Sequence, residues 1–127
     1  MYNWQNKTFL LVDDDKDFCY ILSLILKKTG ANLVITNSGD EALAYYNGIA
    51  GSGKIDLIIL DIQMAHMSGY DFIGIIRNMD ARIPVLALTA YGISGERQRC
   101  LSLGFQEYLA KPFEESRLLD LIQKLLN

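Results

Sequence analysis

The chain has 127 residues, half of them hydrophobic, and its net charge is −3, so it is long enough to form one domain with a buried core. The acidic balance argues against direct contact with nucleic acid, which needs clustered Lys and Arg. No stretch reaches the roughly 20 apolar residues of a membrane span and no signal peptide is visible, so we expect a cytoplasmic domain without membrane contact.

Short apolar runs alternate with longer amphipathic stretches along the chain. The apolar runs are typical of strands buried on both faces of a parallel sheet, and apolar residues three and four apart indicate helices. We predict five strands, at 9–12, 33–35, 55–60, 83–88 and 105–110. Each strand is followed by a predicted helix: through 18–26, from 38, from 68, at about 94–103 and through 118–126. A glycine-rich loop at 48–54 precedes the third strand.

Five strand–helix units in alternation predict an α/β fold. We expect a flavodoxin-like (βα)5 three-layer sandwich, with a parallel five-stranded sheet of order 2-1-3-4-5. Residues 8–127 form this domain, and residues 1–7 are an N-terminal lead-in or linker. In such folds a ligand binds beyond the carboxyl ends of the strands, where the first and third strands meet.

Polar residues follow the predicted strands at that edge: Asp13 and Asp14 after the first, Asp61 after the third, Thr89 after the fourth and Lys111 after the fifth. Three neighbouring carboxylates repel one another unless a cation lies between them. Oxygen ligands of this kind suit Mg²⁺, which also binds substrate phosphates. Lys111 and Thr89 supply a positive charge and a hydroxyl for phosphoryl oxygens.

Asp61 is central on this edge and is the candidate nucleophile. Carboxylates form aspartyl phosphates, and phosphoryl transfer needs mainly positioning and charge neutralisation. Aspartates after strands also cap helices, and we favour that simpler role for Asp15 and Asp17.

The motifs at these strand ends resemble those of a known family. They are Leu11-Val12-Asp13-Asp14, Leu60-Asp61-Ile62-Gln63-Met64, Gly69, Leu88-Thr89-Ala90 and Lys111-Pro112-Phe113. In this order, from about Thr8 to Leu126, they resemble the receiver domains of two-component response regulators, the chemotaxis regulators among them. The resemblance implies that Asp61 takes a phosphoryl group from a phosphohistidine on a histidine kinase or phosphotransfer domain and switches a protein-interaction face. Such a domain catalyses its own phosphorylation and dephosphorylation without being an ordinary enzyme.

The resemblance also assigns roles to single residues. Asp14 and Asp61 would bind Mg²⁺ (or Mn²⁺) directly together with the backbone carbonyl of Gln63, and Asp13 would act through a bound water. Lys111 would contact the phosphoryl group, and the Lys111–Pro112 bond would be cis. Thr89 and Tyr108 would be the switch residues, although Tyr108 packed at a strand edge is an equal alternative. The fourth helix, fifth strand and fifth helix would form the readout face, through which two copies can pair.

Several features leave alternatives open. Ala65 stands where the family usually has proline, which supports a receiver-like interaction module independent of phosphoryl groups. Gln63 and Tyr91 would border the phosphoryl group and influence its lifetime. His66, the single histidine, is expected to be a plain surface residue.

Two enzyme or ligand-binding classes fit the sequence less well. A phosphatase of the haloacid dehalogenase type needs an acid at the position of Gln63, and a nucleotide- or flavin-binding domain needs a glycine-rich turn after the first strand. The aromatic and polar segment 2–7 resembles the linker into receivers of hybrid histidine kinases. The chain is therefore either a single-domain regulator or a piece of such a kinase, and we lean slightly towards the piece.

Overall fold

The computed structural model describes residues 2–48, 55–90, 92 and 94–127, and within them five strands form one parallel sheet. The strands are β1 (Thr8–Val12), β2 (Asn32–Thr36), β3 (Leu57–Asp61), β4 (Val85–Thr89) and β5 (Glu107–Ala110). Their order is β2-β1-β3-β4-β5, which confirms the flavodoxin-like sheet expected from the sequence. Residues 49–54 of the predicted glycine-rich loop, and Tyr91, lie outside the described residues.

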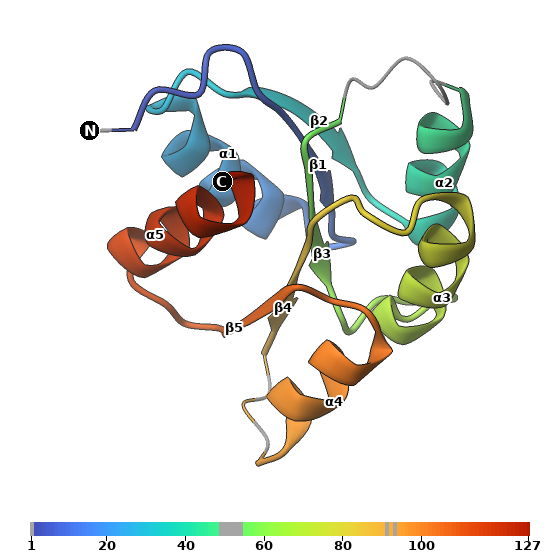
Figure 1. The fold of residues 1–127 in the computed structure, drawn as a ribbon. Coiled ribbons are helices and arrows are strands. Elements are labelled where there is room, and N and C mark those ends of the chain that lie inside the picture. Colours follow the sequence, from blue (N-terminus) through green and yellow to red (C-terminus); the bar gives the residue numbers. More distant parts are fainter. Residues whose placement is uncertain (1, 49–54, 91, 93) are drawn as a thin grey trace.

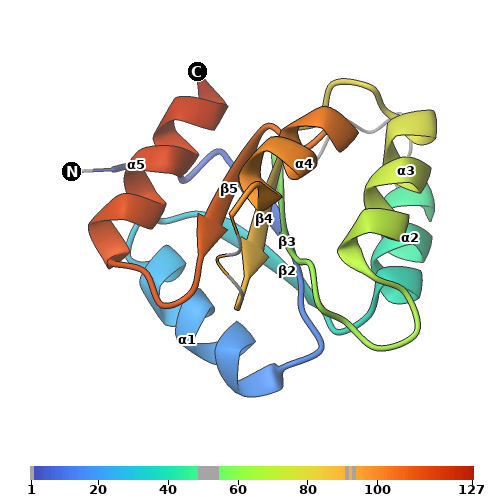
Figure 2. The ribbon, with the colours of Figure 1, turned by 90° about the horizontal axis from the view of Figure 1, so that it is seen from below.

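The helices of the described ranges cover both faces of the sheet. The helices α1 (Lys16–Lys27) and α5 (Glu115–Leu126) lie on one face, and α2 (Gly39–Gly48), α3 (Gly69–Met79) and α4 (Glu96–Leu103) lie on the other (Figure 1 and Figure 2). The three layers follow from right-handed crossovers between parallel strands. Among these helices none is long and apolar enough to cross a membrane.

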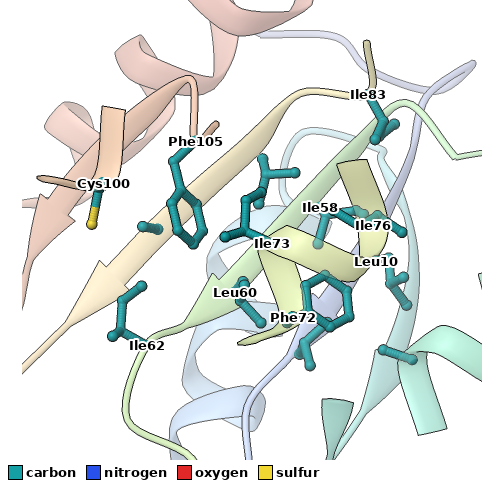
Figure 3. Close-up of a cluster of buried hydrophobic side chains, with 14 of the residues drawn as sticks. Leu10, Ile58, Leu60, Ile62, Phe72, Ile73, Ile76, Ile83, Cys100 and Phe105 are labelled. Atoms are coloured by element: carbon teal, nitrogen blue, oxygen red, sulfur yellow. The ribbon is translucent and has the colours of Figure 1, made fainter. Parts of the chain in front are cut away.

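Two hydrophobic clusters hold the layers together, one on each face of the sheet. Alternate residues of a strand point to opposite faces, so each strand contributes to both clusters. The cluster beneath α2, α3 and α4 is shown in Figure 3 and includes Leu10, Ile58, Leu60, Phe72, Ile73, Ile76, Cys100 and Phe105. The cluster beneath α1 and α5 includes Phe9, Leu11, Leu22, Leu26, Ile59, Leu88, Leu118 and Ile122.

The helix starts are fixed to different degrees. Asp15 caps α1, as expected, because its side chain accepts hydrogen bonds from the N–H groups of Asp17 and Phe18. Ser68 caps α3 in a capping box with Asp71. In contrast, α4 begins after Gly95, which has a φ of 86° and provides no side-chain cap. The beginning of α4 therefore depends on contacts with other elements.

The N-terminal lead-in packs against the domain. Trp4 is 4% exposed and belongs to the cluster beneath α1 and α5. Its backbone N–H donates to the carbonyl of Thr29, and its indole N–H donates to Gln123 of α5 at 3.2 Å. Tyr2 donates to Asp120 of the same helix. The segment thus joins α5 to the end of α1.

Candidate functional site

The carboxyl edge of the sheet brings together charged residues from three strands. Asp13 and Asp14 follow β1, Asp61 ends β3, and Lys111 follows β5. One carboxylate oxygen from each aspartate lies within 4.8 Å of the others. The Lys111 ammonium is 3.3 Å from Asp13 Oδ2 and 3.9 Å from Asp61 Oδ1. Four of the predicted site residues therefore lie in one cluster.

Negative charge is in excess in this cluster. Asp61 is 7% exposed, and burial together with the charge of Asp13 raises the pKa of its carboxyl to about 7. The positive charge of Lys111 and the N–H of Gln63 act in the opposite direction, while Asp14 adds to the increase. One lysine does not compensate three carboxylates, so the cluster favours an additional cation.

The donor atoms of this cluster fit Mg²⁺. They are carboxylate oxygens, which are the ligands that this hard cation prefers, and they converge from two neighbouring strands. Asp14 is exposed, so one side of the cluster is open to solvent and to a phosphate group. The backbone carbonyl of Gln63 and the water at Asp13 stay predictions.

Lys111 is held by an aromatic ring as well as by carboxylates. Its ammonium lies 3.8 Å from the centre of the Phe18 ring, close enough for a cation–π interaction. The Phe18 ring in turn packs edge-on against Phe113, with the ring centres 6.2 Å apart. The Lys111–Pro112 peptide bond is cis. Sequence reasoning missed a role for Phe18, which lies within the predicted helix 18–26. Its position four residues after Asp14 is the signal that could have identified it.

Thr89 lies next to Gln63 in the structure. Its hydroxyl donates to Oε1 of the Gln63 side chain at 3.0 Å, and the Ala90 N–H approaches the same oxygen at 3.4 Å. The Thr89 hydroxyl thus already donates its proton to Gln63, and it would have to leave this acceptor to donate to a phosphoryl oxygen. The sequence predicted that Gln63 borders the site, but not that it binds Thr89. The expectation for Tyr91 falls outside the described part of the chain.

The loop between β3 and α3 folds back on the end of β3. The Gly69 N–H donates to the carbonyl of Ile62, and a Cβ at Gly69 would lie 2.8 Å from the Ile62 Cα, so glycine is required here. The Ala65 N–H donates to Asp14 Oδ2 at 2.9 Å. A proline at this position has no N–H to donate, so the departure at Ala65 supports the orientation of Asp14.

Tyr108 is joined to a different group. Its hydroxyl donates to Oε1 of Glu96 at 2.9 Å, and Tyr70 donates to the other oxygen of that carboxylate at 2.8 Å. Neither Glu96 nor Tyr70 was singled out from the sequence, because the two residues lie on different predicted helices and carry no motif. His66 is exposed and has a φ of 68°, and it is not part of the acidic cluster.

Comparison with known proteins defines the class. A parallel 2-1-3-4-5 sheet with an acidic cluster at its carboxyl edge is an arrangement that can hold a cation together with a phosphate group. The model of the response regulator receiver domain matches residues 9–123. The chain therefore belongs to the response regulator receiver domain family, as the sequence motifs indicated, and its acidic pocket is typical of a phosphoacceptor site.

Relatives and solved structures agree with this assignment. The chain is 34% identical to the transcriptional regulatory protein CpxR of Escherichia coli over 117 residues, which cover 92% of this chain and 48% of CpxR. It is 32% identical to probable histidine kinase 4 of Oryza sativa over 142 residues, covering 94% of this chain and 14% of the kinase. The chain thus spans about half or less of these relatives.

Two solved structures illustrate the similarity of fold. A response regulator receiver domain protein of Clostridium thermocellum has a TM-score of 0.87 at 25% identity, with 95% of this chain and 94% of that chain covered. The response regulator TrrA of Thermotoga maritima, solved in complex with Mg²⁺ and BeF, has a TM-score of 0.82 at 34% identity, with 94% of this chain and 99% of that chain covered.

The phosphatase and nucleotide-binding alternatives lose their support, and the intact acidic cluster does not favour the phosphoryl-independent module.

Proposed function

We propose that Asp61 accepts a phosphoryl group from a phosphohistidine of a histidine kinase or phosphotransfer domain. A carboxylate oxygen of Asp61 would form a bond to phosphorus while the bond between phosphorus and the imidazole nitrogen breaks, and the imidazole would keep the electron pair and later take a proton. One observation carries the proposal: Asp61 lies buried between two further carboxylates and Lys111, in a cluster that favours added positive charge.

Asp13, Asp14 and Asp61 would hold Mg²⁺ or Mn²⁺, with the Gln63 carbonyl as a further ligand and Asp13 acting through water. A bound cation would neutralise charge on the carboxylates and on the phosphoryl oxygens. Lys111 lies 3.9 Å from Asp61 and would bind a phosphoryl oxygen. Thr89 would donate its hydroxyl to another oxygen, for which it must leave the Gln63 side chain.

The movement of Thr89 would be transmitted to Tyr108 on the neighbouring strand. The readout surface would be the α4-β5-α5 face, where partner proteins or a second copy of the chain bind. We place this activity in the cytoplasm, where histidine kinases act, and assign the domain itself no contact with nucleic acid or membrane.

Intact mass spectrometry after incubation with acetyl phosphate and Mg²⁺ tests this proposal. The wild type should gain one phosphoryl group, Asp61→Asn should gain none, and omission of the metal should suppress the gain. Asp40→Asn is a matched control, because Asp40 is an exposed aspartate of α2 and should leave the gain unchanged. No gain in the wild type, or an equal gain in Asp61→Asn, would exclude Asp61 as the acceptor.

A further inference from the structure

A carboxylate outside the acidic cluster joins three elements of the fold. Glu96 is the first residue of α4 and is 8% exposed. Its two oxygens accept hydrogen bonds from Tyr70 of α3 and Tyr108 of β5. Burial and these bonds raise the pKa of both tyrosines to about 12, so both hydroxyls are protonated donors at neutral pH. A buried carboxylate is costly without such donors, which makes each bond consequential.

The position of α4 depends strongly on this carboxylate. Two residues of the helix are buried, Glu96 and Cys100, and its Gly95 cap offers no side-chain hydrogen bond. The Arg99 guanidinium lies 4.1 Å from the centre of the Tyr70 ring and adds a second contact between α3 and α4. A hollow of about 230 Å³, lined in part by Tyr70, Glu96 and Arg99, borders the carboxylate. Water in this hollow can replace a departing tyrosine hydroxyl.

Tyr108 and Thr89 share one face of the sheet. The register pairs Ala87 with Tyr108 and Thr89 with Ala110, and alternate residues along a strand point to the same face. Tyr108 and Thr89 are therefore diagonal neighbours on the two strands, and the strand residues that flank this diagonal are Ala87 and Ala110. A turn of the Tyr108 ring towards Thr89 has small side chains beside it, but it requires the hydroxyl to leave Glu96.

We propose that Glu96 is the positioning residue for Tyr108, and that its carboxylate holds the tyrosine away from Thr89 until a phosphoryl group is present. The inference rests on the phosphoacceptor role proposed for Asp61. A contact made in one state and lost in the other shifts the equilibrium towards the first state. The Tyr108–Glu96 bond thus lowers the affinity of the Asp61 site for a phosphoryl group.

Binding of beryllium fluoride in the presence of Mg²⁺, measured by calorimetric titration, tests this inference. We expect Glu96→Gln to raise the affinity roughly 3- to 10-fold, because an amide oxygen is a weaker acceptor than a carboxylate and cannot serve both tyrosines equally. Tyr108→Phe removes the hydroxyl and should raise it similarly. Tyr70→Phe is the matched control: it removes the other hydroxyl from the same carboxylate and should not raise the affinity.

The outcomes separate this role from a merely structural one. Loss of a structural contact weakens ligand binding, whereas loss of this contact strengthens it. Wild-type affinity or weaker binding in both Glu96→Gln and Tyr108→Phe would overturn the inference while leaving the role of Asp61 intact. A wild type that binds no beryllium fluoride would remove the proposed function and this inference together. If Glu96→Gln fails to fold, Tyr108→Phe decides the matter.

Discussion

Two carboxylates of the sheet are buried to nearly the same extent but have opposite surroundings. Asp61 is 7% exposed and Glu107 is 4% exposed. Burial acts to raise the pKa of both. At Asp61 the like charge of Asp13 adds to the increase, and the pKa reaches about 7. At Glu107 the ammonium of Lys124, the Tyr108 N–H and the Arg97 guanidinium outweigh burial and hold the pKa below its ordinary value.

The difference separates a structural carboxylate from a functional one. Glu107 receives both cations from within the chain, at 3.1 Å from Arg97 and 3.1 Å from Lys124, and so links β5 to α4 and α5. Among the residues that the structure describes, Asp61 shares one lysine with a second aspartate and is left short of positive charge. A buried charge that the chain does not compensate itself indicates a site for an external partner.

The largest expected effect comes from removing the lysine beside Asp61. Lys111→Ala should lower the rate of phosphorylation by acetyl phosphate roughly 100-fold or more, because a positive charge at the phosphoryl oxygens is lost. Lys124→Ala removes a lysine from Glu107 instead and should leave this rate unchanged. Quenched samples analysed by intact mass give both rates. Equal losses in the two variants would contradict the division between the two carboxylates.

Neutralising Asp61 and neutralising Glu107 should change the free energy of unfolding in opposite directions. In the absence of divalent cations at pH 8, Asp61→Asn should raise the free energy of unfolding by on the order of 2 kcal/mol, because the cost of burying the charge and the repulsion from Asp13 both disappear. Glu107→Gln should lower the free energy of unfolding, because its ion pairs with Arg97 and Lys124 are lost. We expect a loss of only about 1 kcal/mol, because both cations are largely exposed and solvent screens these pairs. Urea denaturation measures both. A change of the same sign in both variants would contradict the comparison.

The pH dependence of stability should carry the same signature. The unfolded chain releases the Asp61 proton near pH 4, whereas the folded chain keeps it to about 7. The folded state therefore binds more protons between these values, and stability falls as pH rises through this range. The difference between wild type and Asp61→Asn isolates this contribution, which Mg²⁺ should reduce. The lowered pKa of Glu107 acts only in more acidic solution. A flat difference curve from pH 4 to 8 would exclude the effect.

The smallest expected effect concerns the aromatic ring beneath Lys111. Phe18→Leu keeps an apolar side chain but removes the cation–π contact, and it should slow phosphorylation by roughly 3- to 10-fold. Phe113→Leu removes the ring that packs edge-on against Phe18 but keeps the Phe18 ring next to Lys111, so it should have a weaker effect. Phe18→Tyr keeps an aromatic ring beside Lys111 and should therefore retain the wild-type rate. Equal effects of Phe18→Leu and Phe18→Tyr would show that the ring acts through packing alone.

The sequence predicted the fold and the charged residues of the site, because both depend on local patterns. Apolar runs define the strands, and four of the five runs are followed by Asp13, Asp61, Thr89 or Lys111, so parallel strands must bring these residues to one edge. Strand and helix ends differ from the prediction by a few residues, as at β5, which begins at Glu107 rather than residue 105.

The side-chain contacts across elements could not be predicted in the same way. The bonds from Tyr70 and Tyr108 to Glu96 join residues 26 and 12 positions apart, and Thr89 reaches Gln63 across 26 positions. Periodicity gives the face of a helix but not the rotamer of a side chain, so such partners emerge only from the packed structure. The burial of Trp4 against α5 likewise depends on long-range packing.

The most direct test of the charge imbalance at Asp61 is an NMR titration of its side-chain carboxyl carbon, with and without Mg²⁺. Without the cation we predict a pKa of about 7, with burial and the charge of Asp13 as the causes. With saturating Mg²⁺ the pKa should fall well below that value, because a bound cation favours the ionised carboxylate. An Asp61 pKa near that of an ordinary aspartate, unchanged by Mg²⁺, would contradict the account.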